Sequence, residues 1–249
     1  MAHTNRGRVK AVDTTLDIIQ YIHQVSSASI REVADAVGIG TSTAHRHLTT
    51  LHERGYVTVE ENEYTLSLRF LTHGGRRREA LPANDLINRK VRQLGENTSE
   101  RVQFITEEHG ERVYMYTHAG LDAVKTDATI GKRGPLHVSA AGKAILANLP
   151  TIRQEQILST ESTIEGEKLS ALYDELGNIE KRGYAFNDEE STPGLRAVGV
   201  PVLYESNEVL GAISVSGPAN RLTGEYFREE LPNLLLGTVN EVELNIEYL

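Results

Sequence analysis

The chain has 249 residues, 39% hydrophobic and 24% charged, a composition that excludes general disorder and leaves room for one large or two ordinary domains. The absence of cysteine excludes disulfides, thiol catalysis and cysteine metal sites. No apolar run approaches the roughly 20 residues of a membrane helix, and the polar start MAHTNRGRVK has no signal-peptide core. We therefore expect a cytoplasmic protein with no membrane partner.

The net charge of −9 is unevenly distributed. Residues 1–78 hold ten Lys and Arg against eight Asp and Glu, whereas the rest holds sixteen against twenty-seven. A mildly basic N-terminal part joined to an acidic C-terminal part is typical of two domains with different partners. The acidic excess fits a halophilic source with a high-salt cytoplasm and an ordinary acidic protein equally well.

Three short helices are predicted first. AVDTTLDIIQYIHQV (residues 11–25) repeats apolar residues at intervals of three and four, the spacing of one buried helical stripe. The members of this stripe are Val12, Leu16, Ile19 and Ile22. SIREVADAVGI follows as a second helix, with Ser29 as its N-cap and Gly38 as its end. TSTAHRHLTTLHERGY is the third, and the glycine-containing turn between the last two predicts a helix-turn-helix.

The third helix presents a polar face opposite its apolar residues Ala44, Leu48 and Leu51. Hydroxyl groups, one arginine and one histidine make up this face, and such groups suit phosphates and base edges in a DNA major groove. The candidate DNA-binding residues are Ser42, Thr43, His45, Arg46 and Thr49. A solvated helix face is the alternative, and it is less favoured because YVTVEENEYTLSL predicts a wing hairpin next in the chain.

The tip of this predicted wing, Glu60-Glu61-Asn62, is acidic, so we expect it to add little affinity for phosphate unless salt screens it. The third helix also suggests a metal site, because it carries several histidines. His45 and His47, however, are two residues apart and point about 200° away from each other on a helix. We expect no metal site here.

A linker region follows the wing. In LRFLTHGGRRRE, we expect Leu68, Phe70 and Leu71 to pack back on the first helix and Gly74-Gly75 to break the helical pattern. The basic run that comes next either contacts DNA backbone or is solvated. The predicted domains are a winged helix-turn-helix domain over 1–75, a linker helix over 76–96 and a C-terminal domain over 97–249.

The C-terminal part mixes strands and helices. QFITEEHGERVYMYTHAG reads as two strands around His109-Gly110, and KLSALYDELGNIEKRG as a helix. YAFNDEE, GLRAVGVPVLY and EVLGAISVSG are strand-like, and a last helix runs from about Tyr226 to the end of the chain. This order predicts an α+β domain with one antiparallel sheet.

The segment GPLHVSAAGKAILA contains a Gly-Lys pair ahead of a predicted helix. It is not a nucleotide-binding P-loop, because Gly134 stands seven residues instead of four before Gly142-Lys143 and Ala144 has no hydroxyl for Mg²⁺. A small-residue turn into a helix N-terminus still favours an anion. An enzyme is a further alternative, since His137, Ser139 and Lys143 could supply acid, base and nucleophile. We disfavour it because no motif positions a third group and no GxSxG elbow is present.

The order of these elements resembles the IclR family of transcriptional regulators over nearly the whole chain. The resemblance rests on EVADAVGIGTSTAHRHLTTLHERGYV, on GPLHVSAAGKAILA, and on RGYAFNDEESTPGLRAVGVPV followed by LGAISVSGP. It implies a GAF-like C-terminal domain that binds a small metabolite, commonly an organic acid. It also implies binding of a double-stranded DNA operator by homodimers or by pairs of dimers, with no cofactor and no catalysis. A ligand-independent architectural DNA-binding protein is the alternative, which would leave the C-terminal domain only dimerisation to perform.

The resemblance also assigns an effector site. Backbone N–H groups of Ala140 and Ala141 would hold the effector's carboxylate, with Ser139 as N-cap, and small side chains would let the ligand approach the main chain. We expect Lys143 to point outward to solvent and His137 to be a hydrogen-bonded structural residue. Further family pocket positions fall on Asn187, Leu195, Ala197, Ser214 and Ser216.

Two of these positions depart from family members that carry aspartate at the Asn187 position and cysteine at the Ala197 position. Asparagine is neutral and can donate as well as accept a hydrogen bond, and alanine leaves more room. Ser214 and Ser216 alternate on one predicted strand, so their hydroxyls share a face; they could serve one ligand or bond neighbouring loops. We therefore expect a larger polyhydroxylated or keto acid, such as a sugar acid.

Overall fold

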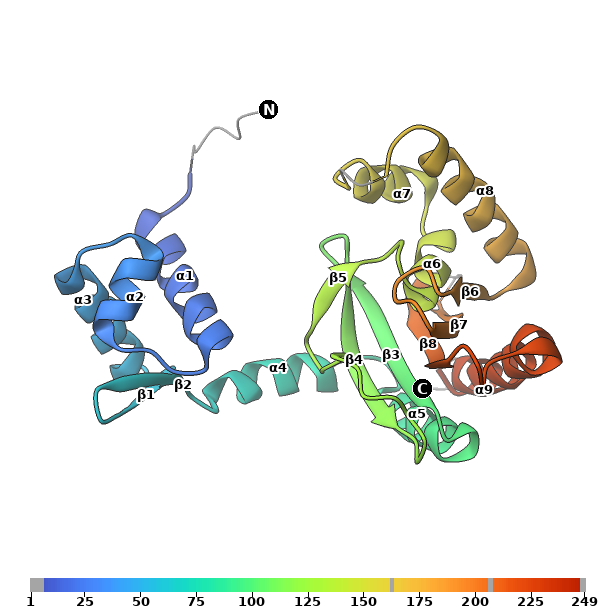
Figure 1. Ribbon diagram of the computed structural model, residues 1–249, viewed down its shortest axis with the longest axis horizontal. Helices are drawn as coiled ribbons and strands as arrows, with labels where there is room; N and C mark the ends of the chain where they lie inside the picture. The colour runs from blue at the N-terminus through green and yellow to red at the C-terminus, as the bar shows by residue number, and fades with distance from the viewer. Residues whose placement is uncertain (1–6, 162–163, 206–207, 247–249) are drawn as a thin grey trace. The chain divides into compact units, whose positions relative to one another are not determined.

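The computed structural model describes residues 7–161, 164–205 and 208–246 (Figure 1). The first six residues of the polar start and the last three of the final predicted helix therefore lie outside the described residues. The chain divides into two compact units, residues 1–77 and 78–249. No described helix is both long and apolar enough to cross a membrane.

The N-terminal unit is a winged helix-turn-helix, as predicted. Its helices and strands are α1 (Lys10–Val25), α2 (Ile30–Val37), α3 (Thr41–Glu53), β1 (Val57–Glu60) and β2 (Glu63–Leu66). Val33 of α2 and Leu48 of α3 meet α1 residues in one small hydrophobic core, which fixes α3 by its apolar side. β1 and β2 pair antiparallel, and the two residues at the tip of the wing, Glu61 and Asn62, have positive φ, as a tight hairpin turn requires.

The buried stripe of α1 differs from the prediction. Ile18 and Ile22 are fully buried, whereas Val12 and Leu16 are 54% and 57% exposed. Towards the start of α1, the contact with α3 is polar instead, because Thr15 Oγ1 bonds Nδ1 of His47 at 2.8 Å. The C-terminal half of α1 therefore supplies most of its apolar packing within this unit.

The turn before α2 is fixed by reciprocal hydrogen bonds at the predicted N-cap. The Ser29 hydroxyl accepts from the amide of Glu32 at 3.4 Å, and the amide of Ser29 donates to the Glu32 carboxylate at 2.8 Å. The amide of Ser29 and its hydroxyl, which donates to the same carboxylate oxygen at 2.7 Å, lower the pKa of Glu32. Because the folded-state pKa is depressed, their stabilising effect is present at neutral pH and is lost as pH falls through that pKa.

Replacing Ser29 by alanine is expected to lower the free energy of unfolding of the N-terminal unit by about 1 kcal/mol, the usual value of an N-cap. Urea denaturation followed by circular dichroism would measure the change. Ser27→Ala is the matched control, because Ser27 is exposed and lies just outside the helix. Equal losses in the two variants would contradict a capping role for Ser29.

The linker region contains two helices in place of the single one predicted over 76–96. They are α4 (Arg69–Glu79) and α5 (Asn84–Thr98), and Ala83 between them adopts the left-handed conformation with φ +51°. Gly74-Gly75 do not break α4, which passes through both. All of α4 is described, and none of its residues is buried.

The predicted packing of the linker on the first helix is also wrong in part. Leu68 and Leu71 are 80% and 68% exposed, so neither is buried against α1. Phe70 makes an aromatic contact with Tyr56, their ring centroids 5.4 Å apart. α5, in contrast, packs on β3 and β4 through Ile87 and Val91, so it is a core helix of the C-terminal unit.

The C-terminal unit is an α+β domain built on one antiparallel sheet, as predicted. The strands are β3 (Arg101–Glu108), β4 (Glu111–Ala119), β5 (Arg133–Pro135), β6 (Ala185–Asp188), β7 (Leu195–Tyr204) and β8 (Glu208–Pro218). Their order in the sheet is β5-β4-β3-β8-β7-β6. The predicted turn at His109-Gly110 connects β3 and β4, and both residues have positive φ.

Helices cover both faces of this sheet (Figure 1). α5 and α9 (Leu231–Ile246, preceded by a π-helical turn at Tyr226–Glu230) pack on one face. α6 (Ala140–Ala147), α7 (Thr151–Leu158) and α8 (Glu167–Arg182) contribute to a second hydrophobic cluster on the other. The second face is the one that carries the candidate effector residues.

Candidate DNA-binding and effector sites

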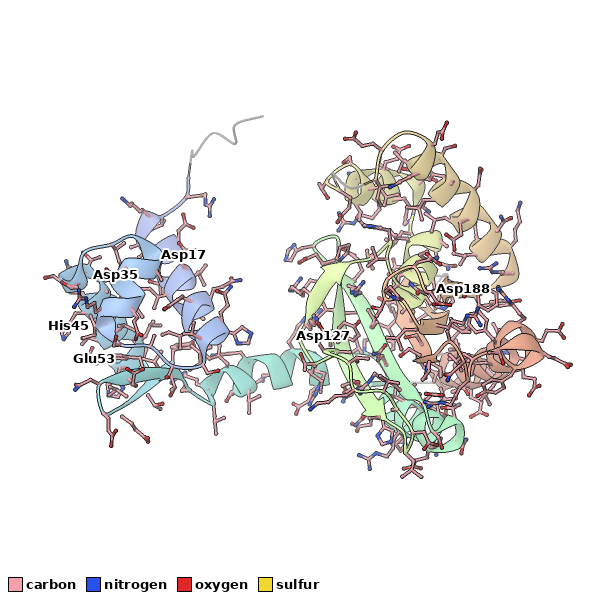
Figure 2. All side chains as sticks on the ribbon, viewed as in Figure 1. Asp17, Asp35, His45, Glu53, Asp127 and Asp188 are labelled. Atoms are coloured by element: carbon pink, nitrogen blue, oxygen red, sulfur yellow. The ribbon has the colours of Figure 1, made fainter. Side chains whose placement is uncertain are left out.

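The outer face of α3 is polar and open. Four of the five candidate DNA-binding residues are exposed there, and Thr49 is half-buried. Ala44, Leu48 and Leu51 are buried in the core beneath them. Figure 2 shows His45 at the outer edge of the N-terminal unit, on the side of α3 remote from α1. Arg46 is exposed on this face, and an arginine in such a position could reach phosphates or base edges.

Two of the other histidines near this face have structural partners. His47 bonds Thr15 on α1, and His52 Nδ1 lies 3.2 Å from the carbonyl oxygen of Val57. Throughout the described part of the chain, no group of three His, Asp or Glu side chains is placed to hold a metal ion. The wing beside α3 brings Glu60 opposite Glu63 at its tip, so its field repels phosphate.

The N-terminus of α6 is formed as predicted. Ser139 is its N-cap, and its hydroxyl accepts from the amide of Gly142 at 3.1 Å. Ala140 and Ala141 occupy the first two helical positions, where amides have no carbonyl of a preceding turn to bond. These two amides therefore carry the partial positive charge of the helix start.

The small residues around this helix start have a packing role that the sequence did not reveal. A Cβ on Gly142 would lie 2.0 Å from the carbonyl oxygen of Leu136. One on Gly199 of β7 would lie 2.6 Å from Ala140 C and Ala141 N. The glycines thus let α6 lie directly against a loop and the sheet, in addition to any approach by a ligand.

Strand register brings three of the candidate effector residues side by side. Asn187, Ala197 and Ser216 are direct neighbours across β6, β7 and β8. Ser214 pairs with Gly199, the residue that touches the start of α6, so the row lies on the same face as α6. Leu195 is two residues before Ala197 on β7 and half-buried.

Two of these side chains are buried and hydrogen-bonded. Asn187 Nδ2 donates to the carbonyl oxygen of Val138 at 2.8 Å, and its Oδ1 accepts from the Ser191 hydroxyl at 3.4 Å. The Ser214 hydroxyl donates to Oε1 of Gln103 at 3.3 Å. Asn187 therefore ties β6 to the loop that leads into α6.

Two polar residues of β3 were missed by sequence reasoning. Arg101 is the cross-strand neighbour of Ser216, and Gln103 that of Ser214. The Arg101 guanidinium donates to the carbonyl oxygen of Val124 at 3.0 Å. Their alternation with the apolar Val102 and Phe104 indicates that Arg101 and Gln103 share one face of the strand. The sequence of a single strand does not, however, predict the register that aligns them with β8.

The expectation that Lys143 points to solvent is wrong. Its side chain is 0% exposed. Nζ donates to Oε1 of Glu175 at 2.7 Å and to both carboxylate oxygens of Glu190, at 2.7 and 2.9 Å. All of α6 is buried, so the ammonium reaches two carboxylates in place of water.

Nδ1 of His137 does not make the hydrogen bond that we expected of a structural histidine: the atom is buried and, among the described residues, has no hydrogen-bond partner. Burial lowers the pKa of His137, which keeps the imidazole neutral near pH 7. The other two residues considered for catalysis have structural roles, because Ser139 caps α6 and Lys143 is ion-paired with two glutamates.

Comparison with known proteins covers both units. Residues 11–61 match the IclR helix-turn-helix domain, and residues 79–243 match the C-terminal domain of bacterial transcriptional regulator IclR. The chain is 30% identical to the probable HTH-type transcriptional regulator ArcR of Halobacterium salinarum, over 96% of this chain and 95% of that protein.

Two solved structures are also similar. The IclR of Thermotoga maritima superposes with a TM-score of 0.76 at 25% identity, covering 95% of this chain and 97% of that one. An IclR homolog of Microbacterium hydrocarbonoxydans, complexed with 4-hydroxybenzoate, superposes with a TM-score of 0.83 at 18% identity, covering 96% of this chain and 100% of that one. At 18% identity, the similarity to the Microbacterium protein shows a shared fold alone.

Proposed function

Because the chain belongs to the IclR family of DNA-binding transcriptional regulators, we propose that its C-terminal unit senses a small organic acid and thereby controls operator binding. The relatives are regulators and not enzymes, so binding is the activity to explain. Effector binding would shift the population between DNA-competent and DNA-incompetent arrangements, with a coupling of roughly 1–3 kcal/mol between the sites.

The observation that carries this proposal is the helix start at Ala140 and Ala141 beside a row of polar strand residues. A carboxylate at these amides would gain both hydrogen bonds and the favourable end of the helix dipole. Asn187 and Ser216 belong to the same sheet face and could bond further oxygens of the ligand. The site therefore suits an acid that also carries hydroxyl or keto groups.

The proposed ligand is a polyhydroxylated or keto acid, such as a sugar acid. The 4-hydroxybenzoate bound by the Microbacterium homolog is also a carboxylate, which supports an organic acid as the ligand, whereas the hydroxyl or keto groups are proposed from the polar residues of this chain. Ala197 would leave room for a longer molecule beside the Asn187 amide. The DNA-binding form is proposed to be a homodimer, with pairing of two dimers on longer operators, in the cytoplasm.

An electrophoretic shift with the DNA upstream of the gene tests the function. We expect a discrete shift that one of a panel of acids (glyoxylate, pyruvate, gluconate and 4-hydroxybenzoate) strengthens or abolishes. Calorimetric titration of the same acids would then rank them, with gluconate binding more tightly than the two short keto acids. Tight binding of only the short acids would contradict the proposed ligand class, and no shift at any salt concentration would contradict operator binding in this region.

Replacing Asn187 by aspartate is expected to weaken acid binding about tenfold, because it exchanges a donor for a charge that repels a carboxylate. Calorimetric titration with the acid that ranks first would measure the loss. Asn148→Asp is the matched control: Asn148 also donates its Nδ2 to a main-chain carbonyl, that of Ala144, but at the opposite end of α6. A similar loss in both variants would contradict a direct role for Asn187.

A further inference from the structure

The buried Lys143 ammonium joins three parts of the C-terminal unit. It lies in α6, Glu175 lies in α8, and Glu190 lies in the segment 189–194 between β6 and β7. Burying an ammonium is unfavourable unless carboxylates compensate it, and both contacts here are short charge-assisted hydrogen bonds. The lysine is therefore held firmly, and so is each group that it contacts.

The segment 189–194 is held by polar contacts alone, among them the Glu190–Lys143 ion pair and a hydrogen bond from the amide of Ala219 to the carbonyl oxygen of Gly194 at 2.8 Å. All six of its residues are described and all are exposed, so it has no apolar anchor in the core. Its internal order comes from polar bonds, such as the amide of Gly194 donating to the Glu189 carboxylate at 2.8 Å. Glu189 and Gly194 both adopt positive φ, so the segment turns sharply at each end. The ion pair between Glu190 and Lys143 connects this exposed segment to buried helix α6.

This segment also contacts the candidate effector site. Ser191 donates its hydroxyl to Oδ1 of Asn187, and the same amide group donates from Nδ2 to Val138, just before the N-cap of α6. The position of Ser191 thus helps to fix the orientation in which the Asn187 amide is presented. Glu190 in turn is held by the Lys143 ammonium, and its Oε1 also accepts from the amide of Asp188 at 3.2 Å.

We propose that Lys143 is a positioning residue for the effector site, acting through Glu190 to hold segment 189–194 and so to fix the Asn187 amide. This inference rests on the proposed effector site for its functional consequence. It gives the two glutamates different roles. Glu190 transmits the position of Lys143 to the segment, whereas Glu175 compensates the charge from α8.

The first test measures hydrogen exchange of the ligand-free full-length protein. The reporters are the amides of Gly194 and Leu195, which bond within the segment. Glu190→Ala should make both exchange at least tenfold faster, and Lys143→Met should do the same. Glu175→Ala is the matched control, because it leaves the Lys143–Glu190 pair intact and should change these rates less than twofold.

A double variant separates positioning from general destabilisation. If Lys143 acts through Glu190, combining Lys143→Met with Glu190→Ala should add nothing to the effect of either change. Glu190 is exposed, so its variant is expected to fold even if Lys143→Met does not. Unchanged exchange in Glu190→Ala, or equal acceleration in Glu175→Ala, would overturn the proposal.

Calorimetric titration with gluconate and 4-hydroxybenzoate extends the test to the site. Glu190→Ala should bind the better of the two acids at least fivefold more weakly, and Glu175→Ala should bind it as the unchanged protein does. Equal affinities in all three proteins would overturn the link from Glu190 to Asn187. If the unchanged protein binds neither acid, the proposed ligand class fails, and the exchange rates still decide whether Lys143 positions the segment.

Discussion

Replacing Arg46 by alanine is expected to weaken operator binding by tenfold to hundredfold, or roughly 1–3 kcal/mol. Arg46 lies on the exposed face of α3, and its guanidinium can donate to two acceptors of one guanine or to phosphate. Its structural contact within the helix is the main-chain carbonyl, which accepts from Thr50 at 2.9 Å and survives the substitution. Melting temperature and effector affinity should therefore remain unchanged.

The control for Arg46 must remove the same charge elsewhere. Lys168→Ala does so on the exposed surface of α8, in the other unit of the chain. Fluorescence anisotropy with operator DNA and with scrambled DNA, over a range of salt concentrations, would separate the effects. A loss confined to the operator would place Arg46 at a base edge, and a uniform loss with a smaller salt slope would place it at phosphate. Equal, small losses in both variants would refute a DNA contact.

Replacing Gly142 by alanine is expected to destabilise the C-terminal unit by about 3 kcal/mol or more, at the upper end of overpacking effects. The added Cβ would overlap the carbonyl oxygen of Leu136, a main-chain atom that cannot rotate away. Relief would require α6 to move off the loop that leads into it. Because Ala140 and Ala141 belong to the same helix start, acid binding should be lost together with stability.

Gly177 provides the matched control for this substitution. It also lies within a helix, α8, but a Cβ there would meet nothing within 4 Å. Gly177→Ala should therefore stabilise the unit by about 0.5–1 kcal/mol, through the lower entropy of the unfolded chain. Guanidinium denaturation of both variants would measure the two changes. Changes of the same sign would contradict the close packing of Gly142.

The helix-turn-helix could be predicted because its signals are local. The apolar spacing of α3 and the glycine turn before it determine which side of that helix is buried. The buried side of α1 was harder to predict, because the adjacent Ile18 and Ile19 belong to two overlapping apolar stripes. Periodicity identifies both stripes, but only the position of α2 and α3 decides that Ile18 is buried while Leu16 is exposed.

The effector site was predictable only where one short segment determines it. The cap at Ser139 follows from the residues next to it, whereas Lys143 pairs with glutamates 32 and 47 residues away. A lysine with no visible partner is expected at the surface, because burying its charge alone is unfavourable. Arg101 and Gln103 are likewise far in sequence from their cross-strand neighbours Ser216 and Ser214. They could not be matched before the strand register was known.

The absence of buried residues along all eleven described positions of α4 has a thermodynamic consequence. A helix gains most of its stability from tertiary packing, and two adjacent glycines each cost α4 about 1 kcal/mol relative to alanine. Its opening free energy is therefore expected to be lower than that of the buried helices of either unit. We therefore expect α4 to unwind and reform while the hydrophobic core of each unit stays intact.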